Sequence, residues 1–291
     1  MSEEVAMEKK EKKMPKEYAA IVTLCIFFTI ITIVGGIRLY FVISIDRARV
    51  DLENIDIIEQ NTTIDTNRMN LAISNTIEEE YGIDVYYGEG VNAVSVNATN
   101  ITDSSEIFAM LRELAGALAK YPQNLIKEIE DKGYMVSLHL VDKFNNNIEA
   151  LANRNSIGQF NIYMSNNLDI ERAFHHEFYH ILDYYIKLET MERYNMWNKY
   201  NPKGFKYSNN VNSLTSKYVY KGQSGAYFVT TYAKYSEKED RAETFAEMMT
   251  ANRMELFFTE GENIKYKMNL IISVLKKSFV TVRNEDSLAW E

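Results

Sequence analysis

The chain has 291 residues, which is enough for one substantial folded domain with additional segments. Its net charge of −9 argues against a general nucleic-acid binder, so we expect no nucleic-acid partner. The single cysteine excludes an intrachain disulfide, and a hydrophobic content of 46% suits a packed globule.

The N-terminal part of the chain predicts a membrane anchor. Residues 1–17 are highly charged and read as a disordered tail. Residues 19–37 contain no charge, and an apolar run of this length fits a membrane-spanning helix, which we place at residues 18–45. A cleaved signal peptide is the alternative, but it has a shorter apolar region and a small-residue cleavage site, and neither is evident.

Charges on either side of the apolar run predict its orientation. Five lysines precede it between residues 9 and 16, whereas three arginines follow it between residues 38 and 49. This bias favours a cytoplasmic N-terminus and places the C-terminal domain outside the cell. Residues 46–80 carry many charges and a weak helical pattern, and we interpret them as a stalk before a folded domain at residues 81–291.

The domain is predicted to belong to the α+β class, with a small mixed sheet and several helices. Helical periodicity over residues 104–120, with Ser104 as a capping residue, is followed by a short helix between Pro122 and Gly133. We expect strands over residues 82–88, 134–141 and 158–165, and C-terminal helices over residues 237–254 and up to about residue 280.

The most informative stretch is His-Glu-x-x-His, from His176 to His180. Three of the four histidines fall within six residues. On a helix the two imidazoles lie one turn apart on one face, where they can bind one zinc ion, and Glu177 beside them is a suitable general base. The helix itself is well supported, because residues 170–188 contain no Gly or Pro and have an apolar face at helical spacing.

A catalytic zinc ion needs a third protein ligand. A histidine further along the same helix is excluded, because Asp183 and Ile186 occupy the positions that the metzincin extension requires. A carboxylate from residues 237–248 is the remaining source. Glu239, Glu243 and Glu247 share one helical face, and their periodicity does not choose among them.

Two motifs together resemble a known family. His176–Asp183 paired with Ala242–Glu247 is similar to the catalytic domain of anthrax lethal factor and the related secreted Pro-Pro endopeptidases. The resemblance implies a zincin-like metalloprotease domain with Glu243 as third zinc ligand. It also implies a tyrosine seven residues before that ligand to stabilise the oxyanion. Position 236 is serine, and the nearest tyrosines are Tyr232 and Tyr235. We assign the role to Tyr232, assuming a short insertion after it, with Tyr235 as the alternative.

These observations predict a membrane-anchored zinc endopeptidase that acts on peptides or proteins. His176, His180 and Glu243 would bind Zn²⁺, Glu177 would act as general base and Tyr232 would stabilise the oxyanion. The substrate would pair with residues 159–165 at the edge of the cleft. The alternative is a non-catalytic, zinc-stabilised adhesion or sensor ectodomain, but a structural zinc site has no need of Glu177.

The predicted topology can be tested on intact cells. Protease added from outside should digest the C-terminal domain and leave the N-terminal tail protected, because lysine-rich segments stay in the cytoplasm. Immunoblotting with an epitope tag at each end measures both fragments. Protection of the C-terminal domain in intact but not in lysed cells would place it inside and contradict the prediction.

Overall fold

The computed structural model describes residues 66–146, 148–155, 158–166, 169–190, 194, 196–208, 226–250, 262–285, 288 and 290. The predicted tail, the predicted membrane anchor and the first part of the predicted stalk lie outside these ranges. Within them, no helix combines the length and the apolar character that a membrane span needs.

The folded unit begins earlier than the sequence predicted. Residues assigned to the end of the stalk form helix α3 (Thr66–Tyr81), which buries Ile73, Ile77 and Tyr81. Its main partner is α4 (Ser104–Leu118). The weak apolar pattern of the predicted stalk is therefore a packing face, and the compact unit starts at Asp65 instead of residue 81.

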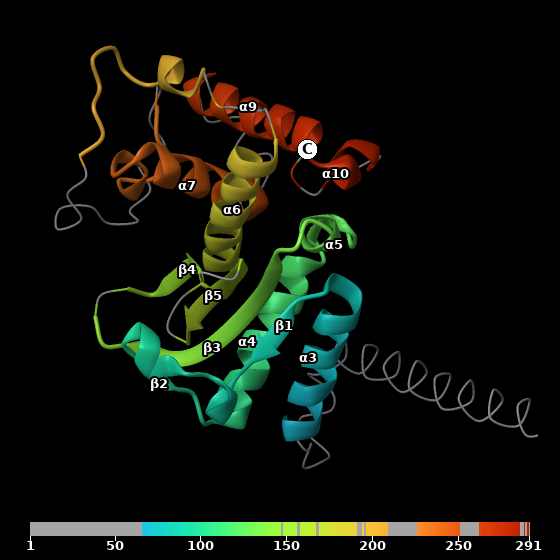
Figure 1. Cartoon of the computed structure of the whole chain (residues 1–291). Coiled ribbons are helices and arrows are strands. Elements are labelled where there is room, and N and C mark those ends of the chain that lie inside the picture. The colour runs from blue at the N-terminus through green and yellow to red at the C-terminus, as the bar shows by residue number, and fades with distance from the viewer. Residues whose placement is uncertain are drawn as a thin grey trace, which may run out of the picture. The chain divides into compact units, whose positions relative to one another are not determined.

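A small mixed sheet lies next to these helices, as the sequence predicted (Figure 1). Strands β1 (Asp84–Tyr86), β3 (Met135–Phe144) and β5 (Gln159–Ser165) are parallel to one another. Strand β4 (Ala150–Arg154) runs antiparallel to β5 and forms one edge of the sheet. Strand β2 (Ala98–Asn100) pairs antiparallel with the far end of β3.

The prediction that residues 159–165 form the edge of the substrate cleft is wrong. Residues 159–165 form β5, which is enclosed between β3 and β4 and is buried along almost its whole length. Strands β2 and β4 were not predicted, because both are short and neither has a strong apolar alternation. Within the described ranges no strand pairs with the outer side of β4, so this edge could pair with an extended peptide.

The helices agree with the predicted ranges to within a few residues. Helix α4 is capped by Asp103 instead of Ser104, because the Asp103 carboxylate accepts hydrogen bonds from the backbone N–H groups of Ser105 and Glu106. The short helix after Pro122 is α5 (Leu125–Glu130).

The motif helix lies between two parts of the molecule. Helix α6 (Ile170–Glu189) contacts β4, β5 and α4 on one side and α7 (Glu237–Thr250) on the other. In Figure 1 it runs from the sheet to the C-terminal helices. Helix α7 in turn packs against α9 (Glu262–Ser278), which α10 (Val280–Asn284) follows. Residues on α6 and α7 thus face each other between the sheet and the C-terminal part.

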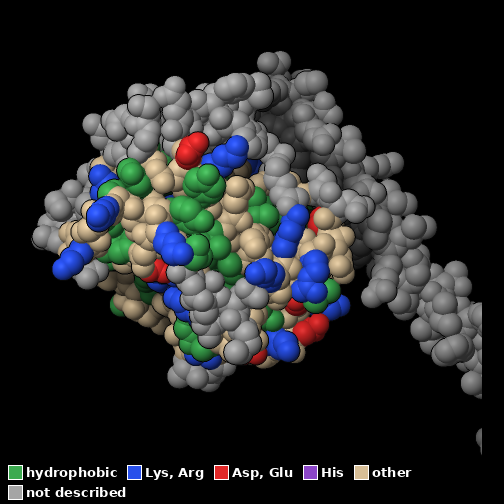
Figure 2. Space-filling model, turned by 90° about the horizontal axis from the view of Figure 1, so that it is seen from above, with side chains coloured by type: hydrophobic (Ala, Val, Ile, Leu, Met, Phe, Trp, Pro, Cys, Tyr) green, Lys and Arg blue, Asp and Glu red, His purple; other side chains and the backbone are tan. Residues whose placement is uncertain are grey.

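Charge is distributed unevenly over these elements. The chain is acidic, yet the face seen in Figure 2 carries more Lys and Arg than Asp and Glu side chains. Helix α7, by contrast, buries its carboxylates: Asp240, Glu243 and Glu247 are each 2% exposed or less. Buried carboxylates are costly without partners, so their contacts determine how α7 is oriented.

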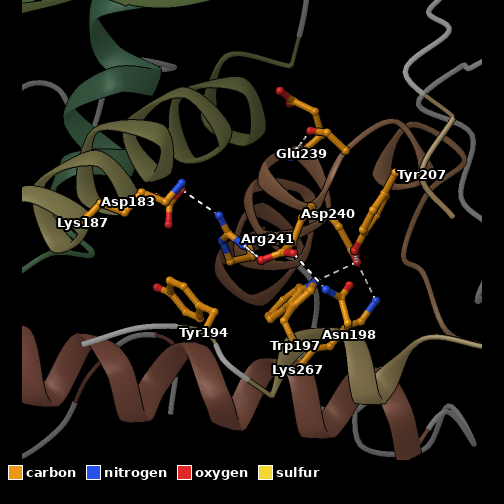
Figure 3. A network of polar contacts seen from close by, with 12 residues as sticks. Asp183, Lys187, Tyr194, Trp197, Asn198, Tyr207, Glu239, Asp240, Arg241 and Lys267 are labelled. Atoms are coloured by element: carbon orange, nitrogen blue, oxygen red, sulfur yellow. Dashed lines mark hydrogen bonds and ion pairs between the residues drawn. The ribbon is translucent and has the colours of Figure 1, made fainter. Parts of the chain in front are cut away.

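Asp240 anchors α7 to the C-terminal part (Figure 3). Its carboxylate accepts hydrogen bonds from Trp197 Nε1 at 2.9 Å, Tyr207 OH at 2.8 Å and Lys267 Nζ at 2.7 Å. Lys267 lies on α9 and is fully buried. Burial raises the pKa of Asp240 and lowers that of Lys267, and the ion pair between them opposes both shifts.

Arg241, the residue after Asp240, anchors α7 to the motif helix α6. Arg241 Nη2 lies 2.9 Å from Asp183 Oδ2 on α6, and its guanidinium lies over the ring of Tyr194. Burial alone would lower the pKa of Arg241, but Asp183 outweighs that effect and raises it. In Figure 3 the Glu239 carboxylate points away from this cluster. The two anchors thus fix the rotation of α7 so that Glu239 and Glu243 face the histidines.

Candidate metal centre

The motif occupies the expected helix and the expected face. Asp169 caps α6 by accepting a hydrogen bond from the Arg172 backbone N–H. Phe174 and Phe178, stacked 5.5 Å apart, are fully buried on the core side. The rings of His176 and His180 lie 4.8 Å apart on the side that faces α7, and both side chains are at most 9% exposed.

Glu239 is the carboxylate that meets both imidazoles. Its Oε2 atom lies 3.0 Å from His176 Nε2 and 3.2 Å from His180 Nε2. Among the described residues, these three side chains form the one group with metal-ligand spacing. Ligand atoms held about 2.0–2.1 Å from one zinc ion at tetrahedral angles are about 3.4 Å apart, so the donor set and its spacing fit zinc.

Glu243, the predicted third ligand, takes a different position. Its Oε1 atom lies 2.8 Å from Nδ1 of His176, the nitrogen on the other side of the ring from Nε2. Its Oε2 atom accepts hydrogen bonds from Thr230 Oγ1 at 2.6 Å and Arg172 Nη2 at 2.8 Å. Three partners surround this carboxylate, and it can hold the His176 ring with Nε2 directed at Glu239.

The contacts control the charges of the site. Burial by itself would lower the pKa of His176, but hydrogen bonds to Glu239 and Glu243 raise it to about 10. Burial would raise the pKa of Glu243, but His176 and Arg172 lower it to about 2. Glu239 likewise has a lowered pKa because of both histidines. Both carboxylates are thus ionised at neutral pH, as a metal ligand and its outer partner must be.

Glu177 is held beside these residues by the edge strand. Its Oε2 atom accepts a hydrogen bond of 2.6 Å from the backbone N–H of Ala152 on β4. The side chain is 9% exposed, so it is largely shielded from bulk water. The carboxylate that the motif predicted as general base therefore lies where the open sheet edge meets the motif helix.

Tyr232, the residue predicted from the sequence to have the oxyanion role, lies near His176. It belongs to a short 3₁₀ turn before α7 (Tyr232–Lys234), and its ring centroid is 6.1 Å from that of His176. Burial and the nearby carboxylates of Glu239, Glu177 and Glu243 raise the pKa of its phenol, which keeps the hydroxyl protonated. Tyr235 stacks on Tyr232 at 5.9 Å, in parallel orientation.

Two other polar residues of α6 have separate roles. His175 is buried, and its Nδ1 atom lies 2.7 Å from Tyr121 OH, while burial lowers its pKa to about 3. Asp183, which could have oriented an imidazole, instead pairs with Arg241 and with Lys187 at 3.2 Å. Sequence reasoning did not find the contacts of Arg172 and Thr230 with Glu243, since no local pattern links these residues.

Comparisons with known proteins add little to this geometry. No family model matches the chain, and no curated protein matches it. One solved structure that it resembles is that of a Bacteroides caccae ATCC 43185 protein provisionally described as a zinc-binding metallo-peptidase. The identity is 17% and the TM-score 0.46, covering 76% of this chain and 92% of that chain. So weak a likeness does not identify the protein, and function has to be inferred from the site.

The positions of the two carboxylates predict different losses of metal. Replacing an outer partner of a ligating histidine lowers metal affinity by about 10–100-fold, whereas losing a ligand costs more. We expect Glu243→Ala to show the smaller loss and Glu239→Ala the larger one. Zinc content after dialysis and titration against a chelator measure both, with Glu247→Ala as a buried-carboxylate control. Zinc lost from Glu243→Ala but retained by Glu239→Ala would restore Glu243 as the ligand.

Proposed function

We propose that the protein is a zinc-dependent endopeptidase. The observation that carries this proposal is the group of His176, His180 and Glu239, with both histidines buried and Glu239 partly buried, and with Glu177 next to it. A purely structural zinc site needs four protein ligands and no general base, whereas a catalytic site has three ligands and leaves one position for water. The chain offers three ligands and a base.

We further propose Glu239, instead of Glu243, as third ligand. The family resemblance implies a tyrosine seven residues before the ligand, and Tyr232 precedes Glu239 by seven positions. No insertion is then needed, and the motif spacing supports the same residue as the distances do. Glu243 becomes the residue that orients His176, with Arg172 and Thr230 holding Glu243 in turn.

The mechanism follows from the positions of the side chains. A zinc ion bound there would supply an acidified water and polarise the scissile carbonyl. Glu177 would take a proton from the attacking water and pass it to the leaving amine. The Tyr232 hydroxyl, protonated because its pKa is raised, would donate a hydrogen bond to the oxyanion as it forms.

The substrate and the location of the enzyme are also proposals. Strand β4 is the open edge beside Glu177, so we propose that a peptide or protein segment binds there in extended form. Anchoring by residues 18–45, with the catalytic domain outside the cell, is supported by the charge-free run and the flanking lysines. The topology experiment above tests this part separately.

The general base is tested by Glu177→Gln. The substitution is nearly isosteric and does not remove a ligand, so zinc content and fold should be unchanged. Hydrolysis should fall by about 10²–10⁴-fold, which is the usual contribution of a general base. Single-turnover rates on a peptide found in a library digest measure the loss. Wild-type rates in the variant would exclude the mechanism, and an inactive wild type would favour the adhesion or sensor function.

The oxyanion role is tested by comparing two neighbouring tyrosines. Tyr232→Phe should lower kcat by about tenfold or more with little change in KM or zinc content, because the lost bond strengthens only in the transition state. Tyr235→Phe is the matched control and should have little effect, since Tyr235 stacks behind Tyr232. A larger loss in Tyr235→Phe would transfer the role to that residue.

A further inference from the structure

The open edge of β4 has a defined register relative to the catalytic base. The backbone N–H of Ala152 points away from β5, because it donates to Glu177. In an antiparallel pair, alternate residues direct their backbone groups to the same side, so Ala150 and Arg154 also present N–H and C=O groups to the open edge. An extended substrate that pairs with β4 would therefore bond to the backbone groups of Ala150 and Arg154, while the N–H of Ala152 stays with Glu177.

Arg154 extends this edge along the motif helix. It lies two residues beyond Ala152, about 7 Å further along the strand. Its Nη1 atom donates a hydrogen bond of 3.0 Å to the Tyr184 hydroxyl on α6. Tyr184 follows His180 by four positions, so it lies one turn beyond that ligand on the same face of the helix. The Arg154 side chain thus lies about one helical turn beyond His180, at the same edge of the sheet as Ala152.

The Arg154 guanidinium is held in place by two aromatic rings, yet it can still donate hydrogen bonds to a ligand. It lies 5.5 Å from the ring centroid of Tyr134 and 5.2 Å from that of Tyr184. Stacking of this kind limits the motion of an arginine without neutralising it. Within the described ranges no ion pair of Arg154 with a carboxylate is found, although the residue is exposed and the chain is strongly acidic. Only one of its five N–H donors has a hydrogen bond there.

We infer that Arg154 forms a subsite for an acidic side chain of the substrate, so that the enzyme prefers peptides with Glu or Asp at one fixed position. Side chains directly opposite each other across two paired strands are about 4.5–5.5 Å apart and lie on the same face. The substrate residue opposite Arg154 would thus reach the guanidinium, which binds carboxylates in a two-pronged fashion. This inference rests on the proposed peptidase function and specifies the substrate class of the same site.

The competing interpretation is that Arg154 serves only to cover Tyr134 and Tyr184. Loss of the arginine would then weaken the packing at this end of the cleft and lower the turnover of all peptides alike. A subsite instead makes the effect depend on the charge of one substrate position. The two interpretations are therefore separated by the dependence of turnover on the charge at one substrate position, and not by the overall rate.

The experiment uses the full-length, zinc-loaded chain and a peptide identified in a library digest. Each position of that peptide is made in turn Gln, Glu and Lys, and kcat/KM is measured for the wild type, Arg154→Gln and Arg154→Glu. Arg112→Glu, at an exposed position on α4, is the control for a change of net charge. The wild type should prefer Glu over Gln by about tenfold at one position, in keeping with a charged hydrogen bond at a partly exposed site.

Arg154→Gln should abolish the preference for Glu at that position, and Arg154→Glu should replace it with a preference for Lys. The Arg112→Glu control should keep the wild-type pattern. The inference is overturned if the wild type shows no charge preference at any position, or if the preference survives in Arg154→Glu.

A binding measurement separates failure of this inference from failure of the proposed function. Fluorescence anisotropy is measured with a labelled degenerate peptide library in which one position at a time is fixed as Gln, Glu or Lys, so that no cleaved peptide is needed. The protein is the zinc-loaded chain carrying Glu177→Gln, with and without Arg154→Glu. If no peptide is cleaved by the wild type but binding shows the charge reversal, the acidic subsite stands and the peptidase function fails. If binding also shows no charge reversal, the subsite is rejected.

Discussion

The structure of this protein depends on the meeting of α6 and α7, where two imidazoles face two carboxylates in a buried site. Burying one ionised carboxylate without compensation would cost several kcal/mol. Glu239 is compensated by the two Nε2 atoms, and Glu243 by His176 Nδ1, Arg172 and Thr230. This arrangement holds the His176 ring in the orientation that a metal ion requires, because each of its nitrogens has a partner. The same contacts that stabilise the helix pair therefore prepare the metal centre.

The orientation of α7 has its own support on the far side of the helix. Asp240 is bound to Lys267 of α9, and Arg241 to Asp183 of α6, so neither rotation nor sliding of α7 is possible without breaking a buried ion pair. Breaking such a pair by removing one partner costs about 3–5 kcal/mol. Three consecutive residues of α7 thus have different contacts. Glu239 faces the histidines, while Asp240 and Arg241 fix the position of α7 relative to α9 and α6.

Strand β4 also contributes to the site, in addition to α6 and α7. Ala152 positions Glu177 through a single backbone hydrogen bond, so the residue that we propose as general base is placed by the same strand that we propose to bind the substrate. Tyr232 approaches from the turn before α7. The side chains of the site come from α6, from α7 and from the turn before α7, and β4 adds the backbone N–H that positions Glu177.

Sequence alone predicted the parts of this site that depend on local periodicity. His176, Glu177 and His180 follow from helical spacing on one uninterrupted helix, and the α7 carboxylates follow from the same rule. The choice between Glu239 and Glu243 did not follow, because residues four apart on one face are equivalent until a partner helix breaks the symmetry. Strand β4 was missed because five residues that read Ala-Leu-Ala-Asn-Arg carry no clear alternation of apolar and polar positions. The packing of α3 was missed because its apolar face is weak and its charges suggested a stalk.

The central claim is that α6 and α7 together bind one zinc ion, with Glu239 and not Glu243 as the carboxylate ligand. The most direct test is a crystal structure of the zinc-loaded protein with anomalous diffraction collected on both sides of the zinc absorption edge. We expect a single anomalous peak bonded to Nε2 of His176, Nε2 of His180 and a carboxylate oxygen of Glu239, with Glu243 still on Nδ1 of His176. A peak bonded to Glu243, or no peak between the two helices, would contradict it.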